Sequence, residues 1–251
     1  MVFHVYQESN VNLSQGQGTN ISASYTEWEL AYWTNPGKNR EVTAIDTTDF
    51  KTGYQIPFST TDFTISVDQF YQNSDANEEA SKITLTPKPI EKQREENIQS
   101  GIFDLKAQGK IYPLTLFGAD GKPTEVTLGD KKYYFILRHK RFELPFIIKL
   151  QSFKAAFHPG TQIAKSFESM VTITNGSLER QVRIYMNNPL RYKDYTVYQA
   201  SYETDSTGRQ YSTLAVVKNF ARILPYIGCL MVFLGLALHF LIRAFMVKSR
   251  V

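Results

Sequence analysis

Two patterns of apolar residues divide the chain. Up to about residue 219, short runs of β-branched and aromatic residues alternate with polar positions and are separated by Gly, Asn, Asp and Pro, a pattern typical of β-strands. From 223 to 242 the sequence is mostly apolar and no charged residue interrupts it. A helix of about twenty residues spans roughly 30 Å, the thickness of a bilayer core. The second pattern therefore predicts one transmembrane helix at 220–245, followed by a short tail at 246–251 on the side of the membrane opposite residues 1–219.

The first pattern predicts a mainly β domain at 1–219. Many short strands at this spacing favour an antiparallel β-sandwich or an open, barrel-like domain over βαβ units. In the strand at 145–153, the side chains of Phe146, Ile148 and Leu150 share one face, which we expect to be buried. The Asn-Gly pair in TNGS (174–177) gives the strongest hairpin signal, and LGDK (128–131) is a second tight turn. The strand candidates are 26–34, 63–67, 82–87, 110–117, 124–128, 132–139, 145–153, 168–173, 180–186, 196–202 and 211–217.

One part of the β domain departs from this pattern. Residues 72–109 are rich in Glu, Gln, Lys and Asn, a composition that favours a solvated surface. We expect this stretch to form an insertion or a surface helix.

Charge and cysteine content exclude several functions. The net charge is +4 and the basic residues are scattered, so no basic stripe indicates nucleic-acid binding. Cys229 is the only cysteine and lies in the apolar segment, which excludes an intrachain disulfide, a CxxC redox pair and a thiolate zinc site. The sequence also lacks the GxSxG, HExxH and GxxxxGK[ST] motifs. No nucleophile with its base can be identified, and we predict that the protein is not an enzyme.

His239 lies near the far end of the predicted span. An ionisable side chain that faces lipid costs a few kcal/mol, so such residues usually face protein or a cavity. Gly228 precedes His239 by eleven positions, which at 100° per residue brings the two within about 20° of one helix face, and Gly235 lies between them. Glycines let another helix approach closely. Ligation of haem iron, a hydrogen bond between helices and snorkelling to the interface all remain open for His239.

The other histidines outside the N-terminus give weaker signals. His139 lies among like charges in LRHKRFE, where we expect a solvated side chain. His158 directly precedes Pro159 and Gly160, where a hydrogen bond in a turn is expected.

The segment 157–203 resembles the ResB family of cytochrome c biogenesis proteins (system II). FHPGTQIAKSFESMVTI and VRIYMNNPLRYKDYTVYQASYE carry the resemblance, which is good from about 143 to 242 and weaker over 1–142. Its most specific elements are Asn187, Asn188 and Pro189, together with Tyr198 and Gln199. A proline can end a strand and asparagines can satisfy turn backbone groups, so we interpret these residues as fold-shaping, as we do for His158, Pro159 and Gly160.

The resemblance implies an extracytoplasmic β domain joined to the last transmembrane helix of a protein in the cell inner membrane, and therefore implies that the tail at 246–251 is cytoplasmic. It implies a complex with a larger multi-span haem-handling protein, and apocytochrome c as the client. Haem would be held mainly by that partner, and covalent attachment would occur there. The family pattern also includes three N-terminal spans, and we expect such segments to export the domain. The alternative is a membrane-anchored β module, for binding or structure, that is unrelated to haem.

Overall fold

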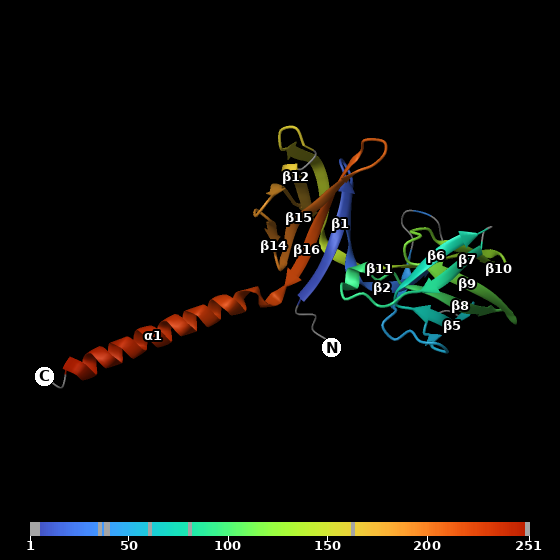
Figure 1. Cartoon of the computed structure of the whole chain (residues 1–251), viewed down its shortest axis with the longest axis horizontal. Helices are drawn as coiled ribbons and strands as arrows, with labels where there is room; N and C mark the ends of the chain where they lie inside the picture. The colour runs from blue at the N-terminus through green and yellow to red at the C-terminus, as the bar shows by residue number, and fades with distance from the viewer. Residues whose placement is uncertain are drawn as a thin grey trace. The chain divides into compact units, whose positions relative to one another are not determined.

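The computed structural model describes residues 6–34, 37, 41–59, 62–79, 82–161 and 164–248. The chain is mainly antiparallel β with one C-terminal α-helix (Figure 1), as predicted. All eleven predicted strands overlap observed ones. The strands are β1 (Tyr6–Ser14), β2 (Gly18–Trp33), β3 (Thr43–Asp46), β4 (Gln55–Ile56), β5 (Thr64–Tyr71), β6 (Ser74–Glu79), β7 (Lys82–Pro87), β8 (Ser100–Ala107), β9 (Lys110–Phe117), β10 (Thr124–Leu128), β11 (Lys131–Phe157), β12 (Ala164–Asn175), β13 (Leu178–Tyr185), β14 (Leu190–Tyr192), β15 (Tyr195–Thr204) and β16 (Gln210–Asn219).

The chain divides into two compact units. The first consists of Met1–Glu8, Asn12–Gly18 and Ile148–Val251, and the second of Ser9–Val11 and Thr19–Ile147. The residues predicted as one domain, 1–219, thus contribute to both. Strands β1, β2 and β11 each carry residues of both units.

The second unit is built from two sheets around one core. Strands β2, β3, β10 and β11 pair in one sheet, and β4, β5, β8 and β9 form the other in the order β4-β5-β8-β9. Side chains from both sheets fill the space between them, because alternate positions of each strand point to the same side. Phe103, Leu105 and Phe135 are completely buried there. This unit corresponds to the predicted sandwich.

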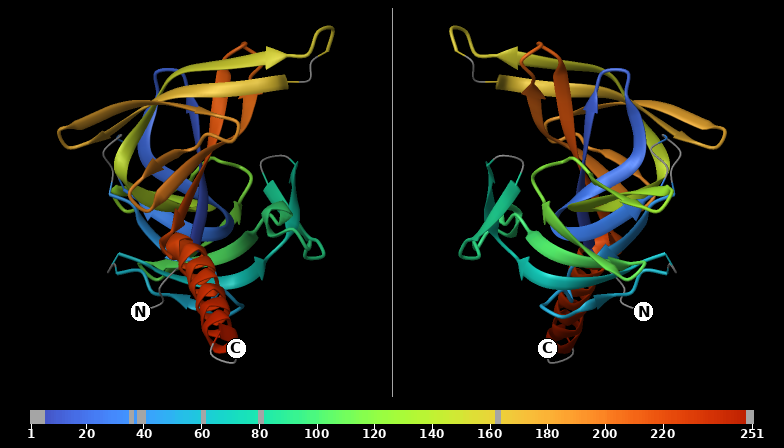
Figure 2. Two further views of the ribbon diagram at one scale, coloured as in Figure 1. Left: turned by 90° about the vertical axis from the view of Figure 1, so that its left-hand side faces the viewer. Right: turned by 90° about the vertical axis from the view of Figure 1, so that its right-hand side faces the viewer.

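The first unit is built on the two ends of the large sheet. The strand order of the large sheet ends with β13 on one side and with β16, β15 and β14 on the other. The two ends meet at a single backbone bridge between Tyr185 and Asn188. The two views in Figure 2 show the strong curvature of these strands, drawn from yellow to red. Buried side chains recur with a period of two in β12, β15 and β16; they include Val171, Ile173, Val197, Leu214 and Val216.

The two predicted tight turns form as hairpins. Asn175 pairs with Leu178 across Gly176 and Ser177, and Leu128 pairs with Lys131 across Gly129 and Asp130. Gly176 has a φ of 58° and Gly129 a φ of 60°. A glycine with positive φ at the first turn position matches the twist of the strands on either side.

The surface helix predicted within 72–109 is wrong. Strands β6 and β7 pair as a hairpin, and β8 follows a single short 3₁₀ turn, η1 (Arg94–Glu96). The intervening loop is held by side-chain amides: Asn73 Nδ2 donates to the Pro89 carbonyl at 2.6 Å, and Asn97 Oδ1 accepts from the Glu91 N–H at 2.8 Å. Such bonds offer the backbone an alternative to helix. The polar composition indicated only that the segment is exposed to solvent. Exposed residues occur in strands and loops as well as in helices.

The C-terminal helix starts directly after β16. The Asn219 side chain accepts a hydrogen bond from the Ala221 N–H at 2.9 Å and so caps the 3₁₀ turn η2 (Phe220–Ile223). Pro225 lies in the first turn of α1 (Leu224–Lys248), where its missing N–H costs nothing. Residues Leu224–Arg243 have a mean hydropathy of 2.1 and are long and apolar enough to cross a membrane. This is the one such helix in the described part of the chain.

Candidate functional site

His158, Pro159 and Gly160 form a tight turn after β11. The His158 carbonyl accepts hydrogen bonds from the Thr161 N–H at 3.1 Å and from Thr161 Oγ1 at 3.2 Å. Proline at the second turn position and Gly160, with a φ of 73°, at the third match a type II turn. The His158 side chain is exposed. The turn hydrogen bond expected at His158 is present, and it uses the backbone.

Asn187, Asn188 and Pro189 shape the connection from β13 to β14. Asn187 has a φ of 62°, a left-handed conformation that asparagine adopts more readily than other non-glycine residues. The Asn188 N–H donates to the Tyr185 carbonyl at 2.9 Å, and the Tyr185 N–H donates back at 3.3 Å. Pro189 then precedes the buried Leu190. These contacts are those of a turn, and the fold-shaping role of the three residues stays a prediction.

Gln199 takes part in a polar network inside the first unit. Its Nε2 donates to Ser212 Oγ at 2.9 Å, and Ser212 Oγ lies 2.7 Å from Ser169 Oγ. Both serines are fully buried, and Gln199 Oε1 is buried without a hydrogen-bond partner in the described structure. The pairing of β15 with β16 shifts register between Gln199 and Ser201. The amide thus lies beside a β-bulge, a feature that re-aims side chains. Tyr198, by contrast, is exposed.

A cavity of about 480 Å³ lies in the same unit. The turn between β1 and β2 and the turn between β15 and β16 bound it. An aromatic cluster stands beside it, because the ring of Tyr202 lies 5.2 Å from Phe153 and 5.5 Å from Phe167. Its lining consists of Ser14, Gln15, Phe153, Gly208, Arg209 and Gln210. Nothing in the sequence pattern marked this cavity, because three separate segments build it.

The three candidate residues of the span lie on α1. A Cβ placed on Gly228 or Gly235 would meet no atom within 4 Å in the described chain. The His239 side chain is exposed, and its ring lies edge-on to Phe240 at 5.7 Å. A packing role for the glycines and a ligand role for His239 stay predictions.

The second unit contains a polar cavity of about 570 Å³ that the sequence did not reveal. The Asp62 carboxylate accepts hydrogen bonds from Tyr133 Oη and from Lys131 Nζ, the latter at 2.8 Å. Lys131 and Tyr133 hold the pKa of Asp62 below its usual value. Burial and the hydrogen bond to Asp62 raise the pKa of Tyr133 to about 12. The cavity lining is Tyr32, Thr34, Asp62, Asp130, Lys131, Lys132, Tyr133 and Tyr134.

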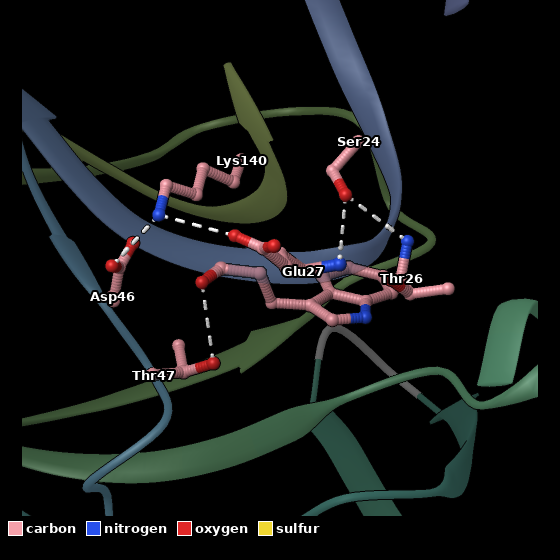
Figure 3. A network of polar contacts seen from close by, with 7 residues as sticks. Ser24, Thr26, Glu27, Asp46, Thr47 and Lys140 are labelled. Carbon is pink, nitrogen blue, oxygen red and sulfur yellow. Dashed lines mark hydrogen bonds and ion pairs between the residues drawn. The ribbon is translucent and has the colours of Figure 1, made fainter. Parts of the chain in front are cut away.

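Two ion-pair groups join β2, β3 and β11 in this unit. Lys140 Nζ lies 2.8 Å from Asp46 Oδ2 and 3.1 Å from Glu27 Oε2 (Figure 3). Burial lowers the pKa of Lys140, but these two carboxylates outweigh that effect and the pKa is raised. Next to this group along the strands, Glu29 and Arg138 form a pair that is almost completely buried. Both groups connect strands, so we interpret them as structural.

The prediction of a solvated His139 is wrong. Its ring lies 4.0 Å from the ring of Trp28, and its Nδ1 is buried without a hydrogen-bond partner in the described structure. Burial lowers the pKa of the imidazole, while a hydrogen bond with the Glu27 backbone acts in the opposite direction. The like charges on either side, Arg138 and Lys140, point to the other face of β11, as strand alternation requires.

Comparison with known proteins identifies the segment that carries these turns. Residues 126–208 match the model of the ResB-like family. The segment 126–208 is ResB-like. The resemblance found in the sequence is thereby confirmed, and all eight motif residues, from His158 to Gln199, lie inside the matched segment. Gly228, Gly235 and His239 lie outside it.

A curated relative agrees with this assignment. Protein NrfI of Wolinella succinogenes is 30% identical to this chain over 145 residues. The alignment covers 55% of this chain and 16% of NrfI. The chain therefore spans about one sixth of the length of the curated relative that it matches.

Proposed function

We propose that this ResB-like chain is a non-enzymatic subunit of a membrane complex for cytochrome c maturation. In this proposal the β units handle apocytochrome c outside the cytoplasm, and α1 docks on a larger haem-handling protein in the inner membrane. The observation that carries the proposal is the ResB-like match over 126–208, which ends shortly before a helix with the length and hydropathy of a membrane span.

The proposal assigns the chemistry of haem attachment to the partner. The chain's own contribution would be to position the client and to bind the partner helix. Gly228 and Gly235 leave space on one face of α1 for close approach of a second helix. Lipid would surround the rest of the helix, whose exposed side chains are large and apolar.

The deciding experiment combines deletion with purification. Removal of this chain should abolish accumulation of holocytochrome c, and the intact chain should co-purify with a larger multi-span membrane protein. Replacement of both Gly228 and Gly235 by Leu should weaken the co-purification, because the two helices would be held apart, whereas Ala237→Leu serves as the matched control. Normal haem attachment after deletion would refute the proposal and leave an anchored β module unrelated to haem.

Haem is proposed to belong mainly to the partner, but His239 fits the requirement for one axial ligand. It presents an exposed imidazole on a segment, 223–242, that carries no charged residue, beside the Phe240 ring. Haem bound there would need further contacts from the partner.

The test of His239 uses the absorption spectrum of the purified complex. If the imidazole ligates iron, His239→Ala should shift or weaken the Soret band, and added imidazole should restore it. If His239 only donates a hydrogen bond between helices, the mutation should reduce co-purification of the partner and leave the band unchanged. An unchanged band therefore removes His239 from the ligands.

A further inference from the structure

Strand β13 has an open edge inside the family-matched segment. Asn175 and Leu178 close a two-residue turn, so they form a hydrogen-bonded pair, and the pairing of β12 with β13 then alternates regularly. Leu178, Arg180, Val182 and Ile184 therefore direct their N–H and C=O groups toward β12. Glu179, Gln181, Arg183 and Tyr185 direct theirs to the opposite side.

The hydrogen bonds of Tyr185 show this outward direction of the backbone groups. Its N–H and C=O both bond to Asn188, at 3.3 and 2.9 Å. Glu179, Gln181 and Arg183 show no backbone partner on that side among the described residues, and β13 ends the strand order of its sheet. The side chains of these three residues are exposed. Three consecutive outward positions are thus free to pair with another strand.

The turn at Asn187, Asn188 and Pro189 prevents β14 from pairing along the outer edge of β13. If the hairpin that begins at Asn188 continued, Leu190 would bond to Arg183. Instead Leu190 pairs with Val197, and Tyr192 with Tyr195 across a two-residue turn, so the backbone groups of Leu190 point to β15. The backbone hydrogen bonds therefore change direction at Pro189: those of Asn188 point to β13 and those of Leu190 point to β15. Across the gap, the side chains of Asn175 and Tyr192 meet, and Asn175 Nδ2 donates to Tyr192 Oη at 3.0 Å.

We infer that the outer edge of β13 binds one extended segment of a client polypeptide as an added antiparallel strand. An edge of alternating N–H and C=O groups pairs with an extended backbone better than with any other class of ligand. Exposed apolar side chains flank it: Leu178 at one end, and Tyr185 and Met186 at the other. These positions accept apolar side chains of the segment, while the paired backbone gives affinity without strict sequence specificity.

The fold favours a single segment over the edge of a folded sheet. Asn188 ties the start of β14 to the end of the same edge, so the free stretch covers only three outward positions and has β14 as a neighbour. A chain that has not yet folded around haem provides such a segment. With this client the inference rests on the proposed function, and it adds the surface on which apocytochrome c is held.

Replacement of Gln181 by proline tests directly whether the free edge of β13 binds the client. Gln181 directs its N–H outward, so Gln181→Pro removes a donor from the free edge and leaves the bonds to β12 intact. Gln181→Ala is the matched control, because it shortens the same side chain and keeps the N–H. Glu179→Pro repeats the test at the next outward position.

The assay is fluorescence anisotropy with the full chain in detergent and fluorescein-labelled apocytochrome c. We expect both proline variants to bind about tenfold more weakly than wild type, and Gln181→Ala to bind within twofold. Hydrogen exchange should show that the client protects the amides of Glu179, Gln181 and Arg183 in the wild-type chain, a readout that needs no mutation. Folded holocytochrome c should not bind.

Three results would overturn the inference. One is equal binding by wild type and proline variants, and another is absence of protection at the three amides. The third is a concentration-dependent dimer of wild type that Gln181→Pro dissociates, which would make a second copy of the chain the occupant. If deletion of the chain abolishes cytochrome c maturation but Gln181→Pro supports it at the wild-type level, the edge is refuted and the proposed function stands. Normal maturation after deletion refutes the proposed function itself.

Discussion

Removal of the Glu29 carboxylate should strongly destabilise the second unit. Glu29 Oε1 accepts a hydrogen bond from Arg138 Nε at 2.8 Å and forms an ion pair with Arg138 Nη2, also at 2.8 Å. The two side chains are only 7% and 11% exposed, and Arg138 Nη1 is buried without a partner in the described structure. Glu29→Ala would leave a guanidinium in the interior with no counter-charge.

The expected loss is about 3–5 kcal/mol, the usual cost of breaking one side of a buried ion pair. This is a large part of the 5–15 kcal/mol that stabilises a typical domain. Replacement of both partners, Glu29→Ala with Arg138→Met, should recover most of the loss, because no buried charge then remains without a partner. Glu125→Ala, which breaks the exposed pair with Lys132, is the control and should have little effect.

The measurement is native-state hydrogen exchange of core amides such as those of Leu30 and Phe103. A chain with two units need not unfold in one step, so exchange reports the second unit more directly than a single melting temperature. The reasoning fails if Glu29→Ala costs less than about 1 kcal/mol, or if the double variant is as unstable as the single one.

Two further predictions concern a turn and a buried imidazole. Asn187→Ala should lower the free energy of unfolding by roughly 1–2 kcal/mol, because alanine disfavours the φ of 62°, whereas Asn187→Gly should leave it nearly unchanged in a denaturant titration; equal losses would contradict this. His139 has a lowered pKa, so the unfolded state binds a proton more readily and stability should fall as pH drops below the unfolded-state value of about 6.5. His139→Phe should remove that acid sensitivity in melts at pH 5 and 8, and an unchanged pH dependence would exclude His139 as its source.

The sequence was most informative where a strand has one buried face. Phe146, Ile148 and Leu150 are buried and Ile147 is exposed, as the period of two predicts. The same period would have placed His139 beside Phe135 and Leu137, on the core face. The flanking charges of Arg138 and Lys140 misled the prediction because adjacent residues of a strand face opposite sides.

Contacts between distant segments could not be predicted from the sequence. Asp62 and Tyr133 are 71 residues apart, and Glu29 and Arg138 are 109 apart. Each pair meets only because segments far apart in the sequence adopt one particular arrangement, which no local spacing encodes. The division between the units was hidden for a similar reason, since it falls between Ile147 and Ile148 within one continuous strand.

The interrupted first unit has a consequence for biosynthesis. Its early segments, up to Gly18, are made before the whole of Thr19–Ile147. Strand β1 can pair with β2 at once on one edge, but its neighbour on the other edge is β16, which starts about 200 residues after the end of β1. At about 5–20 residues per second this edge waits for roughly 10 to 40 seconds. Factors that shield nascent chains should therefore matter most for the N-terminal strand.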